Sequence, residues 1–149
     1  MEIERKYLVS HLPEDYTSFP FHSIEQAYLC TEPVVRIRRE DHEYYLTYKS
    51  KGLLAREEYN LPLTGEAYRH LLTKADGNIL TKKRYLIPLK SQNLTVELDI
   101  FEGKFSGLIL AEVEFPDLES ANNFQPPEWF GEDVTFSGDY QNSRLSRMP

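Results

Sequence analysis

The sequence predicts a mainly β protein of the α+β class, folded as a closed eight-stranded antiparallel barrel with a few covering helices. Three observations support this fold: strand-like segments dominate the chain, short turns join many of them, and most carry one apolar and one charged face. The chain has 149 residues, of which 40% are hydrophobic and 28% charged. This length and composition predict one globular domain over residues 1–149 with enough apolar side chains for a core.

Segments rich in β-branched and aromatic residues define the expected strands, which are 2–9, 22–30, 34–40, 43–50, 54–62, 80–88, 94–102 and 107–115. Turn-forming residues separate them, among them Pro33, Asp41, Gly52 and Gly103. Because several connections are only a few residues long, the strands that they join must run antiparallel.

Helix signals are confined to three short stretches of the chain, which are 64–76, 118–124 and 137–147. Thr64 is a candidate N-cap for the first of them, and Gly77 is expected to end it. Asp117, which follows a proline, is a candidate cap for the second. These helices can cover part of an apolar barrel exterior.

Charged side chains sort by their position along each expected strand. Successive side chains of a strand point to opposite faces, so Glu2, Glu4 and Lys6 share the face opposite Ile3 and Tyr7. Positive side chains gather on the segments 34–40, 43–50 and 80–88, whereas carboxylates gather on 94–102 and 107–115. The charged faces of the later strands contain Arg36, Arg38, Lys49, Arg56, Glu58, Lys82, Arg84, Glu97, Asp99, Glu112 and Glu114.

Two arrangements can explain this pattern. A half-solvated antiparallel sheet also turns its polar side outward, but such a surface usually intersperses the two signs of charge. If about eight strands close into a barrel instead, the charged faces surround an interior wide enough for one small ligand. Uncompensated buried charge is costly, so clustered cations there need a polyanion and clustered carboxylates need a cation. A polyphosphate with a divalent metal satisfies both requirements.

The composition excludes several other classes of protein. The formal charge of −7 argues against binding to nucleic acid duplexes, and Cys30, as the only cysteine, excludes an intrachain disulfide and a cysteine metal cage. No secretory signal and no membrane-spanning run is recognisable, which predicts a cytoplasmic protein without a membrane partner. An outer-membrane barrel is disfavoured because its outward positions would include Arg39, Glu57 and Lys83.

The N-terminal Glu2-x-Glu4-x-Lys6 resembles the ExExK motif of the CYTH superfamily, the triphosphate tunnel metalloenzymes. The likeness continues along the chain in IEQAYL at 24–29, Arg36-x-Arg38, Lys49, AREEYN at 55–60, Lys82-x-Arg84, Glu97 with Asp99, and the closing Glu112-x-Glu114. ExExK alone is a weak signal, but the later basic pairs and the closing ExE follow it in order. The short length and the N-terminal motif look most like the compact bacterial members, several of which hydrolyse inorganic triphosphate.

The resemblance implies that triphosphate lies along the barrel interior beside Mg²⁺ or Mn²⁺. The implied metal ligands are Glu2, Glu4, Glu112 and Glu114. The implied phosphate-binding cations are Lys6, Arg36, Arg38, Lys49, Arg56, Lys82 and Arg84. The implied catalytic set is Glu2, Glu4, Lys6, Glu97, Asp99 and Glu114. The alternative for each of these charges is an ion pair that holds the tunnel open, and Glu97 and Asp99 could also bind a second metal or orient water.

The first functional hypothesis is therefore a metal-dependent triphosphatase that hydrolyses the terminal phosphoanhydride of a triphosphate, with inorganic triphosphate as the preferred substrate. Other enzymes with the same tunnel are a class IV-type adenylate cyclase and a nucleoside or thiamine triphosphatase. A non-catalytic module that binds polyphosphate or nucleotide is a further alternative, although anion binding alone needs no metal-binding carboxylates. The oligomeric state is left open, with a homodimer as one outcome.

Overall fold

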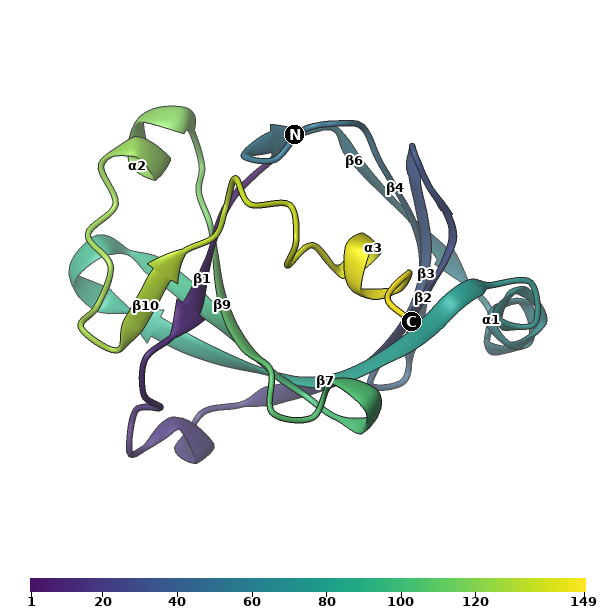
Figure 1. Ribbon diagram of the computed structural model, residues 1–149, viewed down its shortest axis with the longest axis horizontal. Helices are drawn as coiled ribbons and strands as arrows, with labels where there is room; N and C mark the ends of the chain where they lie inside the picture. Colours follow the sequence, from purple (N-terminus) through teal and green to yellow (C-terminus); the bar gives the residue numbers. More distant parts are fainter.

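An antiparallel sheet wraps around a central axis in the computed structural model, which describes residues 1–149 (Figure 1). The order of strands along the sheet is β10-β1-β9-β8-β7-β2-β3-β4-β6, and β5 also pairs with β1. The strands are β1 Glu2–Val9, β2 Phe21–Thr31, β3 Val34–Glu40, β4 Glu43–Lys49, β5 Ala55–Arg56, β6 Glu58–Leu63, β7 Asp76–Leu89, β8 Leu94–Phe101, β9 Ile109–Glu114 and β10 Phe130–Asp133.

Pairing of β5 with β1 closes this sheet nearly completely into a barrel. β5 pairs with β1 at Glu2 and Arg56, and β6 follows β5 directly, so the last strand of the order is tied back to β1. Farther along the same edge of β1 lies β10, and the Val134 amide that follows β10 extends their pairing with a hydrogen bond to the Lys6 carbonyl at 2.8 Å. The expected strand at 54–62 is thus divided between β5 and β6, because its two parts pair with different neighbours. The predicted antiparallel barrel is confirmed, but its sheet has 10 strands where eight were expected, because 54–62 is divided and β10 was not predicted.

The register between strands places charged side chains on the inner face of the barrel and apolar side chains on its outer face. β1 and β9 pair Glu4 with Glu114 and Lys6 with Glu112, so these charged residues share the interior face. On the other face of β1, β8 and β9, apolar side chains pack with residues of α2 and the segment after it into the largest core cluster, which includes Ile3, Tyr7, Val96, Leu98, Ala111, Val113, Ala121 and Phe124. The charged faces therefore point inward, and the half-solvated sheet is excluded.

Two helices cover the outside of the barrel (Figure 1). α1, Gly65–Leu72, begins after Thr64, whose Oγ1 accepts a hydrogen bond from the Ala67 amide at 3.0 Å. α2, Leu118–Asn122, begins after Asp117, whose Oδ1 accepts one from the Ser120 amide at 2.7 Å. Both caps agree with the sequence, and each satisfies an amide that the helix leaves unpaired. No helix of the structure has the length and apolar character needed to cross a membrane.

The first helix is shorter than predicted because β7 begins earlier than predicted. Gly77 lies inside β7 at φ 74°, and does not end the helix. A Cβ at this position would lie 2.1 Å from the Ser146 carbonyl oxygen, so only glycine lets the C-terminal segment approach β7 this closely. The prediction that Gly77 terminates the helix was wrong, since its backbone freedom serves a tertiary contact.

The C-terminal segment returns to the mouth of the barrel and ends in α3, Asn142–Leu145. In the view of Figure 1, α3 lies within the ring of strands. Asn78 at the start of β7 anchors this segment, because its Nδ2 donates to the Leu145 carbonyl at 3.0 Å and to the Met148 carbonyl at 2.7 Å. Side chains that precede and begin α3 therefore reach the barrel interior.

Candidate active site

The barrel encloses a cavity of about 370 Å³ with a charged and polar lining. Only 3 of its 21 lining residues are hydrophobic, so an apolar ligand would find little matching surface. The charged residues on the lining are Glu2, Glu4, Lys6, Arg36, Arg38, Glu40, Lys49, Arg56, Glu58, Arg84, Glu97, Glu112 and Glu114. The structure thus brings most of the predicted site residues together around one space.

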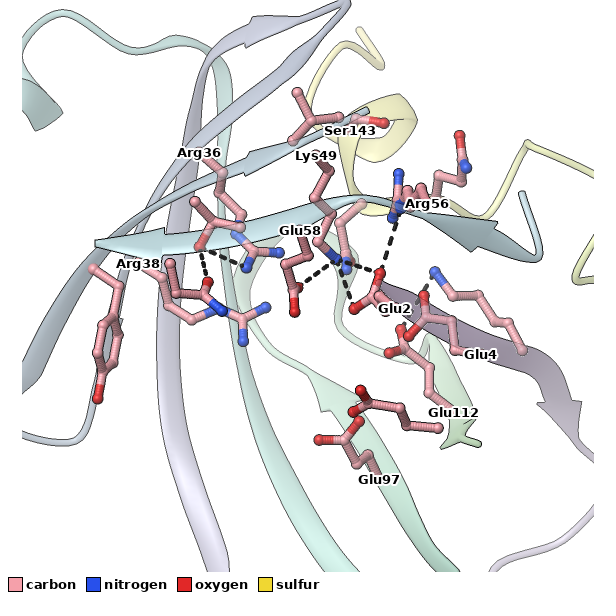
Figure 2. A pocket seen from close by; sticks show the side chains of 18 of the residues that line it. Glu2, Glu4, Arg36, Arg38, Lys49, Arg56, Glu58, Glu97, Glu112 and Ser143 are labelled. Carbon is pink, nitrogen blue, oxygen red and sulfur yellow. Dashed lines mark hydrogen bonds and ion pairs between the residues drawn. The ribbon is translucent and has the colours of Figure 1, made fainter. Parts of the chain in front are cut away.

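Positive charge on β3 faces carboxylates across this space. Figure 2 shows the guanidinium groups of Arg36 and Arg38 on one side and the side chains of Glu4, Glu97 and Glu112 on the other. Arg36 and Arg38 alternate with outward residues of β3, so both point inward. Arg36 and Arg38 therefore lie apart from these three carboxylates, which agrees with the separation of the two charges along the sequence.

Neutral side chains hold both arginines of β3. Arg36 Nη2 donates to Thr47 Oγ1 at 3.3 Å, and Arg36 forms no ion pair. Arg38 donates from Nε and Nη2 to Gln26 Oε1 at 2.9 and 2.6 Å, and its ion pair with Glu40 is long at 3.7 Å. Burial, with Arg36 and Arg84 nearby, lowers the pKa of Arg38 to about 10. This part of the cavity therefore retains positive charge that an anion can neutralise.

Ion pairs neutralise the cations at the β1–β5 junction. Lys49 Nζ lies 3.0 Å from Glu2 Oε1 and 3.4 Å from Glu58 Oε2, and Arg56 Nε lies 3.4 Å from Glu2 Oε1. Burial disfavours the Glu2 carboxylate, but Lys49 and Arg56 outweigh it and lower the pKa of Glu2. Glu2 is therefore an ionised carboxylate that a phosphate group would have to displace from Lys49.

A second network joins β1, β7, β8 and β9. Lys6 Nζ lies 3.3 Å from Glu112 Oε1 and donates to the Tyr140 carbonyl at 3.0 Å. Arg84 lies 3.3 Å from Glu112 and 3.1 Å from Glu97. Despite burial, Lys6 and Arg84 hold the pKa of Glu112 well below its usual value. Glu112 therefore compensates two cations before any ligand arrives.

Lys82 and Asp99 do not reach the cavity surface. Both side chains are 0% exposed, and Lys82 Nζ lies 2.7 Å from Asp99 Oδ2. Arg84 lies between them and the cavity, with its Nε donating to Asp99 Oδ1 and its Nη2 to Asp99 Oδ2 at 2.7 and 2.8 Å. Lys82 and Asp99 therefore lie behind Arg84 and support it. The predicted contact of these two residues with the substrate stays a prediction.

Carboxylates crowd together at the β1–β9 pairing without a cation of their own. Burial and the neighbouring carboxylates of Glu112 and Glu2 raise the pKa of Glu4 to about 8. Burial, Glu2 and Glu97 likewise raise the pKa of Glu114 above its usual value. Neither Glu4 nor Glu114 forms an ion pair, so this cluster lacks the positive charge that would relieve its repulsion.

The donor set of this cluster fits a hard divalent cation such as Mg²⁺ or Mn²⁺, because its ligands are carboxylate oxygens. Glu4 and Glu114 are cross-strand partners on the interior face. No three acidic, histidine or cysteine side chains converge into a ready-made metal cage, since Glu2 and Glu112 are directed toward lysines. The predicted ligands therefore share one region, with two of them engaged by Lys49 and Lys6.

Sequence reasoning missed several residues of the cavity. Thr47 and Asn60 lie at inward positions of β4 and β6, so their parity could have revealed them. Thr47 Oγ1 donates to Asn60 Oδ1 at 2.6 Å and accepts from Arg36, which extends the support of that guanidinium. Three further missed residues come from the C-terminal segment, where no periodic signal marks them, and are Gln141, Asn142 and Ser143.

Comparisons with known proteins agree with this geometry. The CYTH domain profile matches residues 1–149 of the chain. The inorganic triphosphatase of Nitrosomonas europaea is 38% identical over 149 residues, which cover 97% of this chain and 96% of that protein. The inorganic triphosphatase of Acetivibrio thermocellus is 34% identical over 154 residues, which cover 99% of this chain and 94% of that relative. The crystal structure of an inorganic triphosphatase superimposes with a TM-score of 0.74 at 34% identity, covering 100% of this chain and 96% of the other.

Proposed function

This chain belongs to the CYTH family, and from that premise we propose that it is a metal-dependent triphosphatase that hydrolyses the terminal phosphoanhydride of inorganic triphosphate. Two relatives that match nearly the whole chain bear the name inorganic triphosphatase, which supports this substrate. Hydrolysis of that bond yields orthophosphate and pyrophosphate. The proposed partner is the triphosphate itself, and the cytoplasmic location stays a prediction.

The single observation that carries this proposal is the separation of uncompensated charge inside the cavity. Arg36 and Arg38 are held by neutral acceptors, whereas Glu4 and Glu114 have no cation partner and raised pKa values. A polyanion satisfies the first pair and a divalent cation the second. A metal–triphosphate complex supplies both charges in one ligand.

The cations of the cavity would perform most of the work in phosphoryl transfer, which depends on positioning and charge stabilisation. Arg36 and Arg38 would donate to oxygens of the phosphate chain, and their fixed guanidinium planes suit bidentate contacts. Lys49 would exchange its contact with Glu2 for a phosphate oxygen. Charge that develops on the equatorial oxygens would thus meet donors that are already in place.

Carboxylates on the opposite wall of the cavity would bind the metal and accept the proton of the attacking water. Glu4 and Glu114, with Glu2 and Glu112, are the residues we propose as Mg²⁺ or Mn²⁺ ligands. When bound, such an ion neutralises charge on the phosphate oxygens and on the departing pyrophosphate. Glu97 lines the cavity and burial raises its pKa, so it is suited to accept a proton from water during in-line attack.

The lining of the cavity favours inorganic triphosphate over a nucleotide or thiamine triphosphate. Its only hydrophobic members are Tyr28, Val34 and Tyr45, among 21 lining residues. A nucleobase normally needs an apolar or aromatic surface that it can stack against. Inorganic triphosphate needs only donors and a cation, which this cavity supplies.

A substrate panel tests the proposal. Inorganic triphosphate, ATP and thiamine triphosphate are incubated with the protein in Mg²⁺, in Mn²⁺ and in EDTA, and the products are separated. We expect orthophosphate and pyrophosphate from inorganic triphosphate with either metal and none in EDTA. Cyclic AMP from ATP would identify a cyclase, and binding without turnover of any member would identify a non-catalytic module. Either result would overturn the proposed reaction.

A further inference from the structure

Gln26 is a fully buried polar residue that no part of the proposed reaction uses. It lies on β2, where its cross-strand partners are Arg38 of β3 and Leu80 of β7. Its exposed fraction is 0%, and it is not on the cavity lining. Its Oε1 accepts two hydrogen bonds from Arg38, at 2.9 Å from Nε and 2.6 Å from Nη2.

This contact fixes the plane of the Arg38 guanidinium. Two of its five N–H groups are directed at Gln26, and Nη1 faces Glu40 at 3.7 Å. The remaining N–H groups of Arg38 are therefore free to meet a ligand in the cavity that Arg38 lines. A guanidinium held in this way loses less conformational freedom when an anion binds.

The acceptor is an amide, unlike the carboxylates that hold most other cations of the cavity. Lys6, Lys49, Arg56 and Arg84 each lie within 3.4 Å of at least one carboxylate oxygen. Gln26 orients Arg38 without adding a negative charge beside it, so the only carboxylate on Arg38 is the long contact with Glu40 at 3.7 Å, and the guanidinium stays available to a phosphate oxygen. A carboxylate in the same place would form a buried, hydrogen-bonded pair that competes with the ligand.

We propose that Gln26 is a positioning residue for triphosphate binding whose essential property is its neutrality: it orients Arg38 while adding no negative charge beside it. The inference deepens the proposed function and rests on it. Gln26 acts through Arg38 and does not touch the substrate. The residue therefore sets how strongly β3 attracts the phosphate chain.

The Nε2 atom of Gln26 makes the proposal testable by a single isosteric change. Nε2 is buried and has no hydrogen-bond partner. Gln26→Glu therefore replaces an atom that makes no bond, keeps the acceptor for Arg38 and adds one negative charge. Gln26→Met keeps a similar volume, removes the acceptor and adds no charge. The two variants separate charge from hydrogen bonding.

The experiment measures the Kd of inorganic triphosphate (tripolyphosphate) by calorimetry for the wild type and both variants. EDTA is present, so that no turnover occurs. We expect affinity to fall in the order wild type, Gln26→Met, Gln26→Glu, with Gln26→Glu at least about tenfold weaker than the wild type. Gln125→Glu adds the same charge at an exposed position outside the cavity and should stay within about twofold of the wild type. Circular dichroism and melting curves establish that each variant is folded.

A residue that only preserves structure would give the opposite order, because glutamate resembles glutamine more closely than methionine does. Binding by Gln26→Glu within about twofold of the wild type would therefore overturn the inference. If Gln26→Glu does not fold, the inference still requires Gln26→Met to bind more weakly than Gln125→Glu, and equal affinities would overturn it. A wild type that binds no tripolyphosphate would instead contradict the proposed function.

Discussion

Asp99 Oδ2 accepts a hydrogen bond from Lys82 Nζ at 2.7 Å, and no solvent reaches either side chain. The same carboxylate accepts two hydrogen bonds from Arg84, whose guanidinium lines the cavity. Despite burial, Arg84 and Lys82 lower the pKa of Asp99. One buried carboxylate thus supports a cation of the cavity and a lysine behind it.

Asp99→Asn should destabilise the barrel strongly, since it leaves Lys82 and Arg84 with less compensation for buried charge. Breaking a buried pair by removing one partner costs about 3–5 kcal/mol in typical proteins. We expect a loss of this size in the free energy of unfolding, measured by urea denaturation at pH 7. Glu97→Gln is the comparison, because the Glu97 side chain is 28% exposed and its loss should cost less. A loss below about 1 kcal/mol for Asp99→Asn would show that the pair is not a stabilising element.

Glu4→Gln should change how stability depends on pH in the metal-free protein. The pKa of Glu4 is raised from 4.5 to about 8, so between these values the folded protein holds a proton that the unfolded chain releases. The free energy of unfolding therefore falls as pH rises through this window. Glu4→Gln removes that loss, so the variant should match the wild type near pH 4 and exceed it at pH 9.

Urea denaturation in EDTA at both pH values measures this effect, with the exposed Glu128→Gln as control. The same Glu4→Gln protein should retain its fold and lose metal-dependent turnover, since one anionic ligand is gone. A variant whose stability follows pH as the wild type does would mean that Glu4 is not crowded by other carboxylates. Near-normal turnover at saturating Mg²⁺ would place the metal elsewhere.

Binding of Mg²⁺ should release a proton near neutral pH. A ligand carboxylate must be ionised, and burial with the Glu112 and Glu2 carboxylates holds the pKa of Glu4 at about 8 in the metal-free protein. The apparent affinity for Mg²⁺ should therefore rise between pH 6 and 8 and level off above pH 9. Calorimetric titrations in two buffers of different ionisation enthalpy measure the released protons directly. No proton release at pH 7 would indicate that Glu4 is already ionised or is not a ligand.

Much of this site could be predicted from the sequence because every second residue of a strand points to the same face of the sheet. Glu2, Glu4 and Lys6 share a face wherever β1 pairs, so their inward direction needed only the closure of the barrel. How deep a side chain lies within the barrel could not be predicted in this way, because its depth depends on the tilt of the strand and on the neighbouring side chains. Lys82 and Arg84 have the same parity, yet only Arg84 lines the cavity.

Features that depend on distant contacts could not be predicted in the same way. β10 is only four residues long and is stabilised by its pairing with β1, so it has no alternation of its own. Gly77 looked like a helix terminator, but its φ of 74° serves the approach of the C-terminal segment. Gln26 has no charge, so the alternation of charged and apolar residues that revealed Arg38 did not mark it.

The melting temperature of the folded barrel with its ligands tests the central claim, that this cavity takes a three-phosphate chain together with a metal. A ligand that binds only the folded state at a hundredfold excess over Kd stabilises it by about 2.7 kcal/mol. For a domain of this size that corresponds to a rise of roughly 5–10 °C. Tripolyphosphate with Ca²⁺, used as a non-turnover ion, should produce such a rise, and orthophosphate with Ca²⁺ at equal concentration a clearly smaller one, because it occupies only part of the basic wall. Equal shifts from the two anions would contradict the account.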